Sequence, residues 1–161
     1  MIICGTGHRP NKLGGYSIEN LLLLSKMCAN RLKEIDDLDH VISGMALGFD
    51  TALASSCVAL GIPFTAAVPF RGQEKIWNTR DQEMYNILLD KAQKVVILSE
   101  DAYSPYLLQK RNEWMVDNSD MVLACWDGSS GGTRNCIRYA LAQGKKIINC
   151  YGSFETMKGM K

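Results

Sequence analysis

The sequence has almost no net charge and no long hydrophobic segment. Its 18 Lys and Arg residues are balanced by 17 Asp and Glu residues, which gives a formal net charge of +1. Such a balance provides no long-range field that would attract nucleic acid or an anionic membrane. No apolar run approaches the roughly 20 residues that span a bilayer, and the N-terminus lacks the basic region of a secretory signal. We therefore expect a cytoplasmic protein without a membrane partner, in which any polyanion binds at a local site.

Paired cysteines and clustered histidines are also missing. The six cysteines contain no CxxC pair, and most of them lie inside apolar stretches. This pattern predicts buried, reduced thiols and argues against a zinc or other metal site. His8 and His40 are the two histidines, and His40 precedes an apolar run, where a surface or packing role is expected. No Ser-His-Asp or Cys-His arrangement for nucleophilic catalysis can be assembled from these residues.

What the sequence does contain is a regular alternation of short apolar runs and longer amphipathic runs. The short runs predict strands at residues 1–5, 40–43, 63–68, 94–98, 121–126 and 146–150. The longer runs have helical spacing at residues 17–35, 49–60, 79–90, 105–118 and 133–143.

Apolar strands that are separated by helices must be buried on both faces, as in a parallel sheet with helices on each side. The predicted fold class is therefore α/β, a Rossmann-like three-layer sandwich with a mostly parallel sheet of about six strands. The length predicts a single domain over residues 1–161, with a loosely held tail at residues 151–161.

The loop after the first strand is a candidate ligand site, because ligands of such sheets bind beyond the carboxyl ends of the strands. Its candidate residues are Gly5, Thr6, Gly7, His8 and Arg9. Glycines let backbone N–H groups approach an anion, Arg9 offers a forked cationic donor, and His8 can donate to a phosphate. The dinucleotide-binding fingerprint is absent, because Pro10 replaces its third glycine and no acidic residue follows the second strand.

Two further loops lead into helix N-termini, where free N–H groups and the helix dipole favour an anion. The loop after the second strand supplies Gly44, Met45 and Asp50. Asp50 is either an ordinary charge in a first helical turn or a carboxylate that faces the ligand. The loop after the fifth strand has the clearest phosphate-binding pattern, and its candidates are Asp127, Gly128, Gly131, Gly132 and Thr133.

The remaining candidates suit recognition of a base. Phe70, Gln73 and Trp77 follow the third strand and combine aromatic faces with an amide that can read a base edge. Packing in the core or at the rim is the alternative for Phe70 and Trp77. Arg111 and Asn112 lie on a predicted helix at the same end of the sheet, where a solvated helix face is the alternative.

These motifs together resemble the YpsA-type branch of the SLOG superfamily over nearly the whole chain. The matching segments are Gly5–Pro10, Ser43–Asp50, Pro69–Phe70 with Gln73 and Trp77, Arg111–Asn112, and Gly131–Thr133. The resemblance implies a Rossmann-like fold, binding of a nucleotide or nucleotide-derived molecule, and self-association as a homo-oligomer. The superfamily also contains the LOG-type phosphoribohydrolases and the Rossmann domain of the DNA-processing protein DprA.

One position departs from the LOG-type enzymes, whose PGGxGTxxE motif ends in a glutamate that serves N-glycosidic cleavage. When that motif is laid on Gly132 and Thr133, Cys136 occupies the glutamate position, and a thiol cannot supply the carboxylate. The leading hypothesis is therefore a binding protein that senses or sequesters a nucleotide-like molecule, without a certain cofactor.

Two alternatives to this binding role stay open. One is a nucleotide N-glycosidase or phosphoribohydrolase in which Asp50, Glu74 or Glu113 replaces the missing glutamate, with Asp50 and Glu113 as the foremost catalytic candidates. The other is single-stranded DNA binding, which the near-neutral charge disfavours because such proteins usually offer a basic groove.

Overall fold

The computed structural model describes residues 1–160 and confirms the predicted α/β class. Six strands form one sheet in which every pairing is parallel, in the order β4-β3-β2-β1-β5-β6. The strands are β1 (Ile2–Gly7), β2 (His40–Ser43), β3 (Phe64–Val68), β4 (Lys94–Ile97), β5 (Met121–Cys125) and β6 (Lys146–Asn149). Each strand begins and ends within two residues of its predicted position.

The five predicted helices are also present, and a sixth follows them. They are α1 (Ile18–Lys33), α2 (Phe49–Leu60), α3 (Thr79–Lys91), α4 (Pro105–Asp117), α5 (Gly132–Ala142) and α6 (Tyr151–Gly159), with short 3-10 turns η1 (Pro10–Lys12) and η2 (Gln73–Ile76). Side chains that accept a hydrogen bond from the first helical turn fix three of the starts: Ser17 for α1, Asn78 for α3 and Ser104 for α4. Among the described residues, no helix is both long and apolar enough to cross a membrane.

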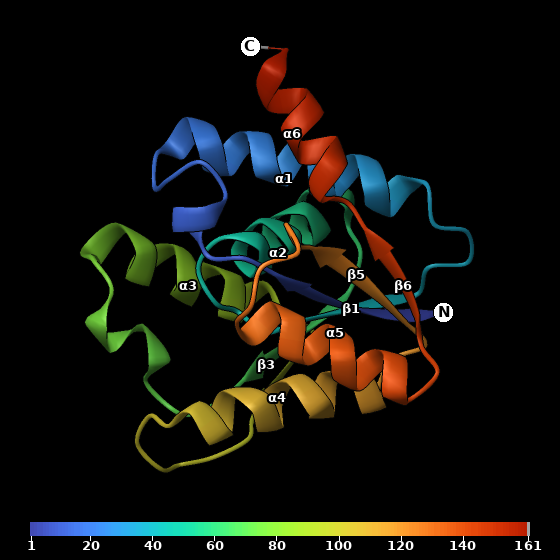
Figure 1. Cartoon of the computed structure of the whole chain (residues 1–161). Helices are drawn as coiled ribbons and strands as arrows, with labels where there is room; N and C mark the ends of the chain where they lie inside the picture. Colours follow the sequence, from blue (N-terminus) through green and yellow to red (C-terminus); the bar gives the residue numbers. More distant parts are fainter. Residues whose placement is uncertain (161) are drawn as a thin grey trace.

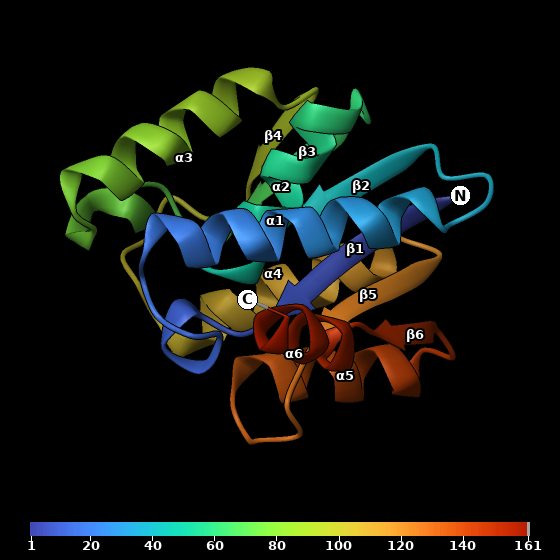
Figure 2. The same ribbon diagram turned by 90° about the horizontal axis from the view of Figure 1, so that it is seen from above.

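The helices cover the two faces of the sheet unequally (Figures 1 and 2). α1, α2, α3 and α6 lie on one face, and α4 and α5 lie on the other. Successive residues of each strand point to opposite faces, so Ile3 joins the core under α1 and α2 while Cys4 joins the core under α4 and α5. All six cysteines are buried and free, as the sequence predicts.

The prediction of a loosely held tail is wrong for residues 151–160. Tyr151–Gly159 form α6, which packs against α1 (Figure 1). Phe154 is fully buried, and Tyr151 and Met157 pack beside it at a spacing of three residues. This spacing gives α6 one apolar stripe, which anchors it to the core. Residue 161 lies outside the described residues.

The strand order positions the candidate site. From β1 the chain proceeds outward through β2, β3 and β4, and α4 then returns it across the opposite face to β5, on the other side of β1. The direction of winding therefore reverses between β1 and β5. In open α/β sheets this reversal separates the loops beyond the strand ends and leaves a crevice there.

Candidate functional site

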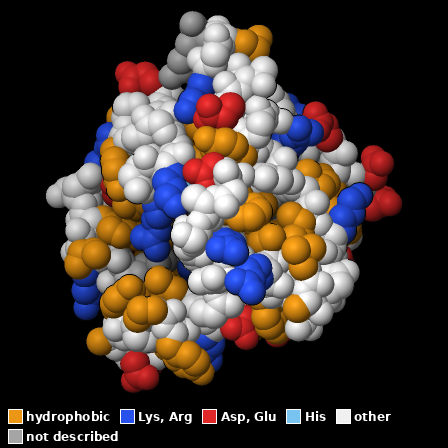
Figure 3. Space-filling model, viewed as in Figure 1, with side chains coloured by type: hydrophobic (Ala, Val, Ile, Leu, Met, Phe, Trp, Pro, Cys, Tyr) orange, Lys and Arg blue, Asp and Glu red, His pale blue; other side chains and the backbone are white. Residues whose placement is uncertain are grey.

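A cleft of about 300 Å³ lies at this reversal point, beyond the carboxyl ends of β1 and β5. Its volume is at the lower end of the range of small-molecule sites. Eleven of the predicted ligand residues line it: Gly5, Thr6, Gly7, His8, Arg9, Asp50, Arg111, Asn112, Gly131, Gly132 and Thr133. The space-filling view shows Lys and Arg side chains gathered near the middle of the face that Figure 1 presents (Figure 3).

Five further residues line the cleft that the sequence analysis did not single out. They are Asn11, Lys12, Ala46, Leu108 and Met115. The Lys12 ammonium donates to the Ser129 hydroxyl at 2.7 Å and to the Ser130 carbonyl at 3.3 Å, so it joins the loops after β1 and β5. Leu108 and Met115 could have been found from helical spacing, because they lie three residues before and four after Arg111.

The glycines of β1 have a different role from the one expected. Gly5 and Gly7 are inside the strand, not in the loop after it. A Cβ at Gly5 would overlap the Leu53 side chain, and a Cβ at Gly7 would lie 2.5 Å from Cβ and 2.6 Å from Cδ1 of Phe49. These glycines therefore let α2 pack directly on the strand. Their backbone also forms part of the cleft floor.

Asp50 and Arg111 form the buried polar centre of the cleft. Their side chains are 6% and 5% exposed. Arg111 Nη1 donates to the Gly44 carbonyl at 2.5 Å, and the Ala46 N–H donates to Asp50 Oδ2 at 3.2 Å. A Cβ at Gly44 would lie 2.7 Å from Arg111 Nη1 and 2.9 Å from Asp50 Oδ2, so glycine at this position makes room for both groups.

Burial dominates the electrostatics of this pair. It raises the pKa of the Asp50 carboxyl, and the Arg111 charge opposes that rise. Burial likewise lowers the pKa of the Arg111 guanidinium, and the Asp50 carboxylate opposes that fall. Each group thus stabilises the charged form of the other where water is scarce. The cleft floor offers a carboxylate and a guanidinium side by side.

The N-terminus of α5 forms the opposite wall. Gly131 caps this helix at a φ of 141°, a conformation that favours glycine. Gly132 has no such constraint, and a Cβ built there meets no described neighbour within 4 Å. The packing of the described chain therefore does not require glycine at position 132. Its missing side chain instead leaves the free N–H groups of the helix start open to the cleft.

His8 and Asp127 fix the loop between β5 and α5. His8 Nε2 donates to Asp127 Oδ1 at 2.7 Å, and the Ser129 hydroxyl and N–H donate to the same oxygen at 2.5 and 2.9 Å. The Ser129 hydroxyl is the main reason why the pKa of Asp127 falls below its usual range. Gly128 makes the turn at a φ of 92°. Asp127 and Gly128 thus shape the cleft wall without lining it.

The aromatic candidates do not line the cleft. Phe70 packs edge-on against Tyr103 with ring centroids 5.8 Å apart, and Trp77 packs edge-on against Tyr85 at 5.3 Å. The Gln73 amide is buried and donates to the Met45 carbonyl at 3.4 Å and to the Tyr85 hydroxyl at 3.5 Å. Phe70 and Trp77 therefore pack against neighbouring tyrosines and do not face the cleft.

The remaining candidates differ in position. Met45 is buried beside the cleft, where its φ of 61° turns the loop toward α2. Glu74 and Glu113 are half-buried and do not line the cleft. Cys136 is fully buried under β1, and burial raises the pKa of its thiol to about 11. Of the proposed substitutes for the missing glutamate, only Asp50 lies in the cleft.

Comparison with known proteins agrees with this architecture. The chain is 38% identical over 116 residues to the uncharacterised SPbeta prophage-derived protein YoqJ of Bacillus subtilis strain 168, a match that covers 62% of this chain and 67% of YoqJ. The fold is similar to that of DprA from Streptococcus pneumoniae, with a TM-score of 0.63 at 15% identity, over 90% of this chain and 48% of DprA. The chain thus spans about half the length of that protein.

A second DprA, from Helicobacter pylori and studied for its single-stranded DNA binding mode, has a TM-score of 0.63 at 16% identity. That match covers 91% of this chain and 63% of the H. pylori protein. The YpsA family model, described as the YspA SLOG family, matches residues 3–151. This match includes the whole cleft and all of the six strands except Ile2, the first residue of β1. The chain therefore belongs to the YpsA family of SLOG proteins.

Proposed function

We propose that this protein binds a nucleotide or nucleotide-derived small molecule in the cleft and acts as a sensor or store for it. The observation that carries the proposal is Gly132. Neither its backbone conformation nor its described neighbours require glycine, yet its missing side chain opens the N-terminus of α5 to the cleft. Space kept in front of free N–H groups suits an anionic group such as a phosphate.

The charges around the cleft suit the same ligand. Arg9, Lys12 and Arg111 line it together with a single carboxylate, Asp50. Cations therefore outnumber anions along this wall although the whole chain is almost neutral. A phosphate would meet Arg9 and Lys12 at the rim and the helix start inside. The buried carboxylate of Asp50 would accept from a ribose hydroxyl, which is the kind of neutral donor that such a group needs.

Hydrolysis of the ligand has less support than binding. Among the lining residues, Asp50 is the one carboxylate, and its position beside Arg111 stabilises it as a hydrogen-bond acceptor. The thiol of Cys136 lies in the core with its pKa raised, so it offers neither a carboxylate nor a thiolate to the cleft. A phosphoribohydrolase would have to use Asp50 both to bind and to activate water.

Single-stranded DNA binding is a second candidate, and the similarity to the two DprA folds favours it. The cleft fits it less well. Lys12 bridges the loops after β1 and β5, and the aromatic side chains expected to stack on bases pack against Tyr103 and Tyr85. Sequence-tolerant binding of single strands usually needs exposed stacking surfaces along a basic groove.

The test measures thermal stability and reaction products in the same samples. Purified protein is incubated with nucleoside monophosphates, NAD, ADP-ribose and cyclic nucleotides. A ligand at 100 times its dissociation constant should add about 2.7 kcal/mol of stability, or roughly 5 to 11 °C in melting temperature. Recovery of the intact ligand supports a sensor or store. Release of a free base would establish the enzyme instead.

Two glycine variants provide a matched comparison. Gly132→Val fills the space in front of α5 and should abolish the stabilisation by ligand. Gly152→Val is the control, because Gly152 lies in the first turn of α6 with equally open surroundings and does not line the cleft. Equal stabilisation of both variants would refute the proposed site. Salt-sensitive binding of a labelled oligothymidylate, without any nucleotide effect, would favour the DNA alternative.

A further inference from the structure

The outer strand β4 has side chains that are incompletely covered. It ends the sheet beyond β3 (Figure 2). All side chains of β3 are buried, whereas Lys94 and Val95 of β4 are exposed, and the next two residues, Val96 and Ile97, are half-buried. The Val95 side chain is 41% exposed. An apolar edge of this kind is a place where another chain can pair with a sheet.

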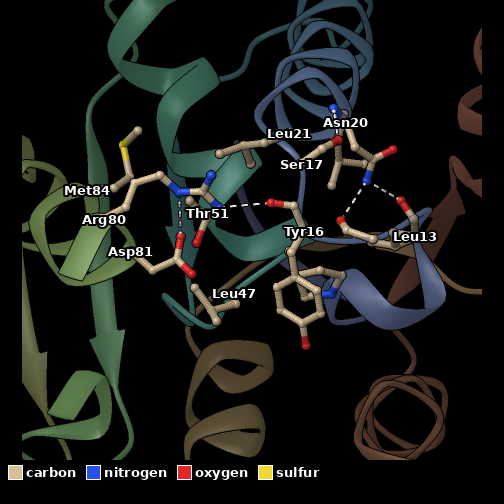
Figure 4. A pocket seen from close by; sticks show the side chains of 14 residues that line it. Leu13, Tyr16, Ser17, Asn20, Leu21, Leu47, Thr51, Arg80, Asp81 and Met84 are labelled. Atoms are coloured by element: carbon tan, nitrogen blue, oxygen red, sulfur yellow. Dashed lines mark hydrogen bonds and ion pairs between the residues drawn. The ribbon is translucent and has the colours of Figure 1, made fainter. Parts of the chain in front are cut away.

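The helices leave the outer side of β4 open. Among residues 1–160, β3 is the one element that packs closely against β4. α3 packs on α2 and η2, and it directs Arg80, Asp81 and Met84 toward α1 and the start of α2 (Figure 4). On the opposite face, α4 packs on α5, β1 and β3. The edge of the strand is therefore accessible to a second chain.

The backbone of β4 also has polar groups that point away from the sheet. The Leu98 N–H donates to the Val68 carbonyl at 2.9 Å, so residue 98 directs its N–H toward β3. Successive residues of a strand turn their N–H and C=O groups to opposite sides, and those of Val95 and Ile97 therefore point outward. Such a row of donors and acceptors is a template for one more strand.

The charges at the two ends of β4 have opposite signs. Lys91 and Lys94 lie at the start of the strand, and Glu100 and Asp101 follow its end. Glu100 accepts two hydrogen bonds from Arg71, at 2.7 and 3.0 Å, and stays 70% exposed, so its carboxylate can also accept from a lysine of another molecule. An antiparallel pairing of two copies joins start to end. It therefore sets the lysines of each copy beside the carboxylates of the other.

The opposite edge strand, β6, lacks this complementarity. Lys145 and Lys146 lie at its start, but the first carboxylate after its end is that of Glu155 on α6. Glu155 already pairs with Lys158 at 2.8 Å. Two β6 strands side by side would bring their lysines together without acidic partners. The charge pattern thus favours β4 over β6 as the edge that pairs with itself.

We propose that a second copy of this chain pairs with β4 in antiparallel orientation about a two-fold axis, so that one sheet continues through both copies. An axis beside Val96 pairs Val95 of each copy with Ile97 of the other, which uses the outward groups of both residues. Lys94 then lies diagonally across from Glu100 on the same face, within reach of a long side chain. The cleft stays open, because β2 and β3 separate β4 from β1.

The test is sedimentation velocity of the full chain between about 10 μM and about 1 mM, because pairing of such short strands makes a small and therefore weak interface. Lys94→Glu and Glu100→Lys should each raise the dissociation constant at least about tenfold, since like charges then face each other at both ends. An equimolar mixture of the two variants should recover the dimer, because every lysine again meets a carboxylate. Lys146→Glu, at the start of β6, is the control and should dimerise like the native chain.

Amide hydrogen exchange gives a second measurement on the same proteins. The outward N–H groups of Val95 and Ile97 should exchange more slowly at concentrations where the native chain dimerises than at high dilution. The same groups in Lys94→Glu should exchange equally fast at both concentrations. Absence of protection in a native dimer would show that β4 is not the contact.

The outcomes separate clearly once circular dichroism shows that all variants fold. Dimerisation that is lost in each charge variant and recovered in their mixture supports the paired β4 strands. A native chain that stays monomeric over the whole range overturns the proposal. Charge variants that dimerise like the native chain overturn it too, as does a mixture that stays monomeric. None of these results involves a nucleotide, so failure here leaves the function of the cleft to its own test.

Discussion

Replacing Gly7 with alanine should destabilise the fold through a single added methyl group. The new Cβ would lie 2.5 Å from Cβ and 2.6 Å from Cδ1 of Phe49, which is fully buried between α2 and the sheet. Phe49 cannot move away without displacing α2, because its ring is enclosed by the core on that face. Overpacking of this kind costs about 1–3 kcal/mol. For a chain of this size the melting temperature should fall by roughly 2 to 12 °C.

The assay is urea unfolding followed by circular dichroism, combined with a double-mutant cycle. Phe49→Leu removes part of the ring that the new methyl group would strike. The double variant Gly7→Ala/Phe49→Leu should therefore lose less stability than the sum of the two single changes, by about 1 kcal/mol. Unchanged stability in Gly7→Ala, or simple additivity in the cycle, would show that the glycine is not a packing requirement.

The same substitution at Gly132 should have the opposite consequence. A Cβ there meets no described neighbour within 4 Å, and alanine is favoured over glycine in a helix by up to about 1 kcal/mol. Gly132→Ala should therefore match or slightly exceed the native stability while it weakens binding of a nucleotide in the cleft. A fall in stability similar to that of Gly7→Ala would contradict the assignment of Gly132 to the ligand.

Three further outcomes follow from the fold. Phe154→Ala should lower the free energy of unfolding by about 3–5 kcal/mol, whereas Met160→Ala, at an 81% exposed side chain, should change it little in the same urea titration. Burial raises the pKa of Asp50 above its ordinary value of 3.8, so the folded state binds the proton more tightly than the unfolded state does. The stability gained in this way is complete below the ordinary pKa and is lost as the pH rises through the folded pKa. Asp50→Asn should therefore become more stable relative to the native protein as the pH rises from about 4 to 7, and an equal difference at every pH would refute this. The six buried thiols should react with Ellman's reagent only at the rate of unfolding, and fast labelling of any of them in buffer would be inconsistent with their burial.

Strand and helix positions could be predicted from the sequence because periodicity records burial directly. The strand order could not, since the alternation of elements is the same for several orders of a parallel sheet. The apolar stripe of α6 was missed because Phe154 is the one fully buried residue in a nine-residue helix that begins directly after β6. A stripe this short does not reveal a helical period in the sequence. It can be recognised only once α1 is seen to lie beside it.

Most of the candidate cleft could be predicted because parallel strands place their following loops at one edge. The roles of individual residues in the cleft could not be predicted from the sequence. A glycine that lets a helix pack on a strand and a glycine that leaves a helix start open to a cleft look alike in sequence, and so Gly7 and Gly132 could not be distinguished. Trp77 and Gln73 follow a strand as ligand residues often do, yet their loop turns back into the core beside Tyr85.

The position of the cleft between β1 and β5 has a consequence for the order in which the protein acquires function. One wall comes from the first residues of the chain and the other from residues beyond 126, with nearly the whole domain between them. If the cleft binds a ligand as proposed, a chain emerging from the ribosome could not hold it until β5 and α5 have joined the sheet. Ligand bound in the cleft would therefore act as a clamp that selects completed molecules over partly folded ones.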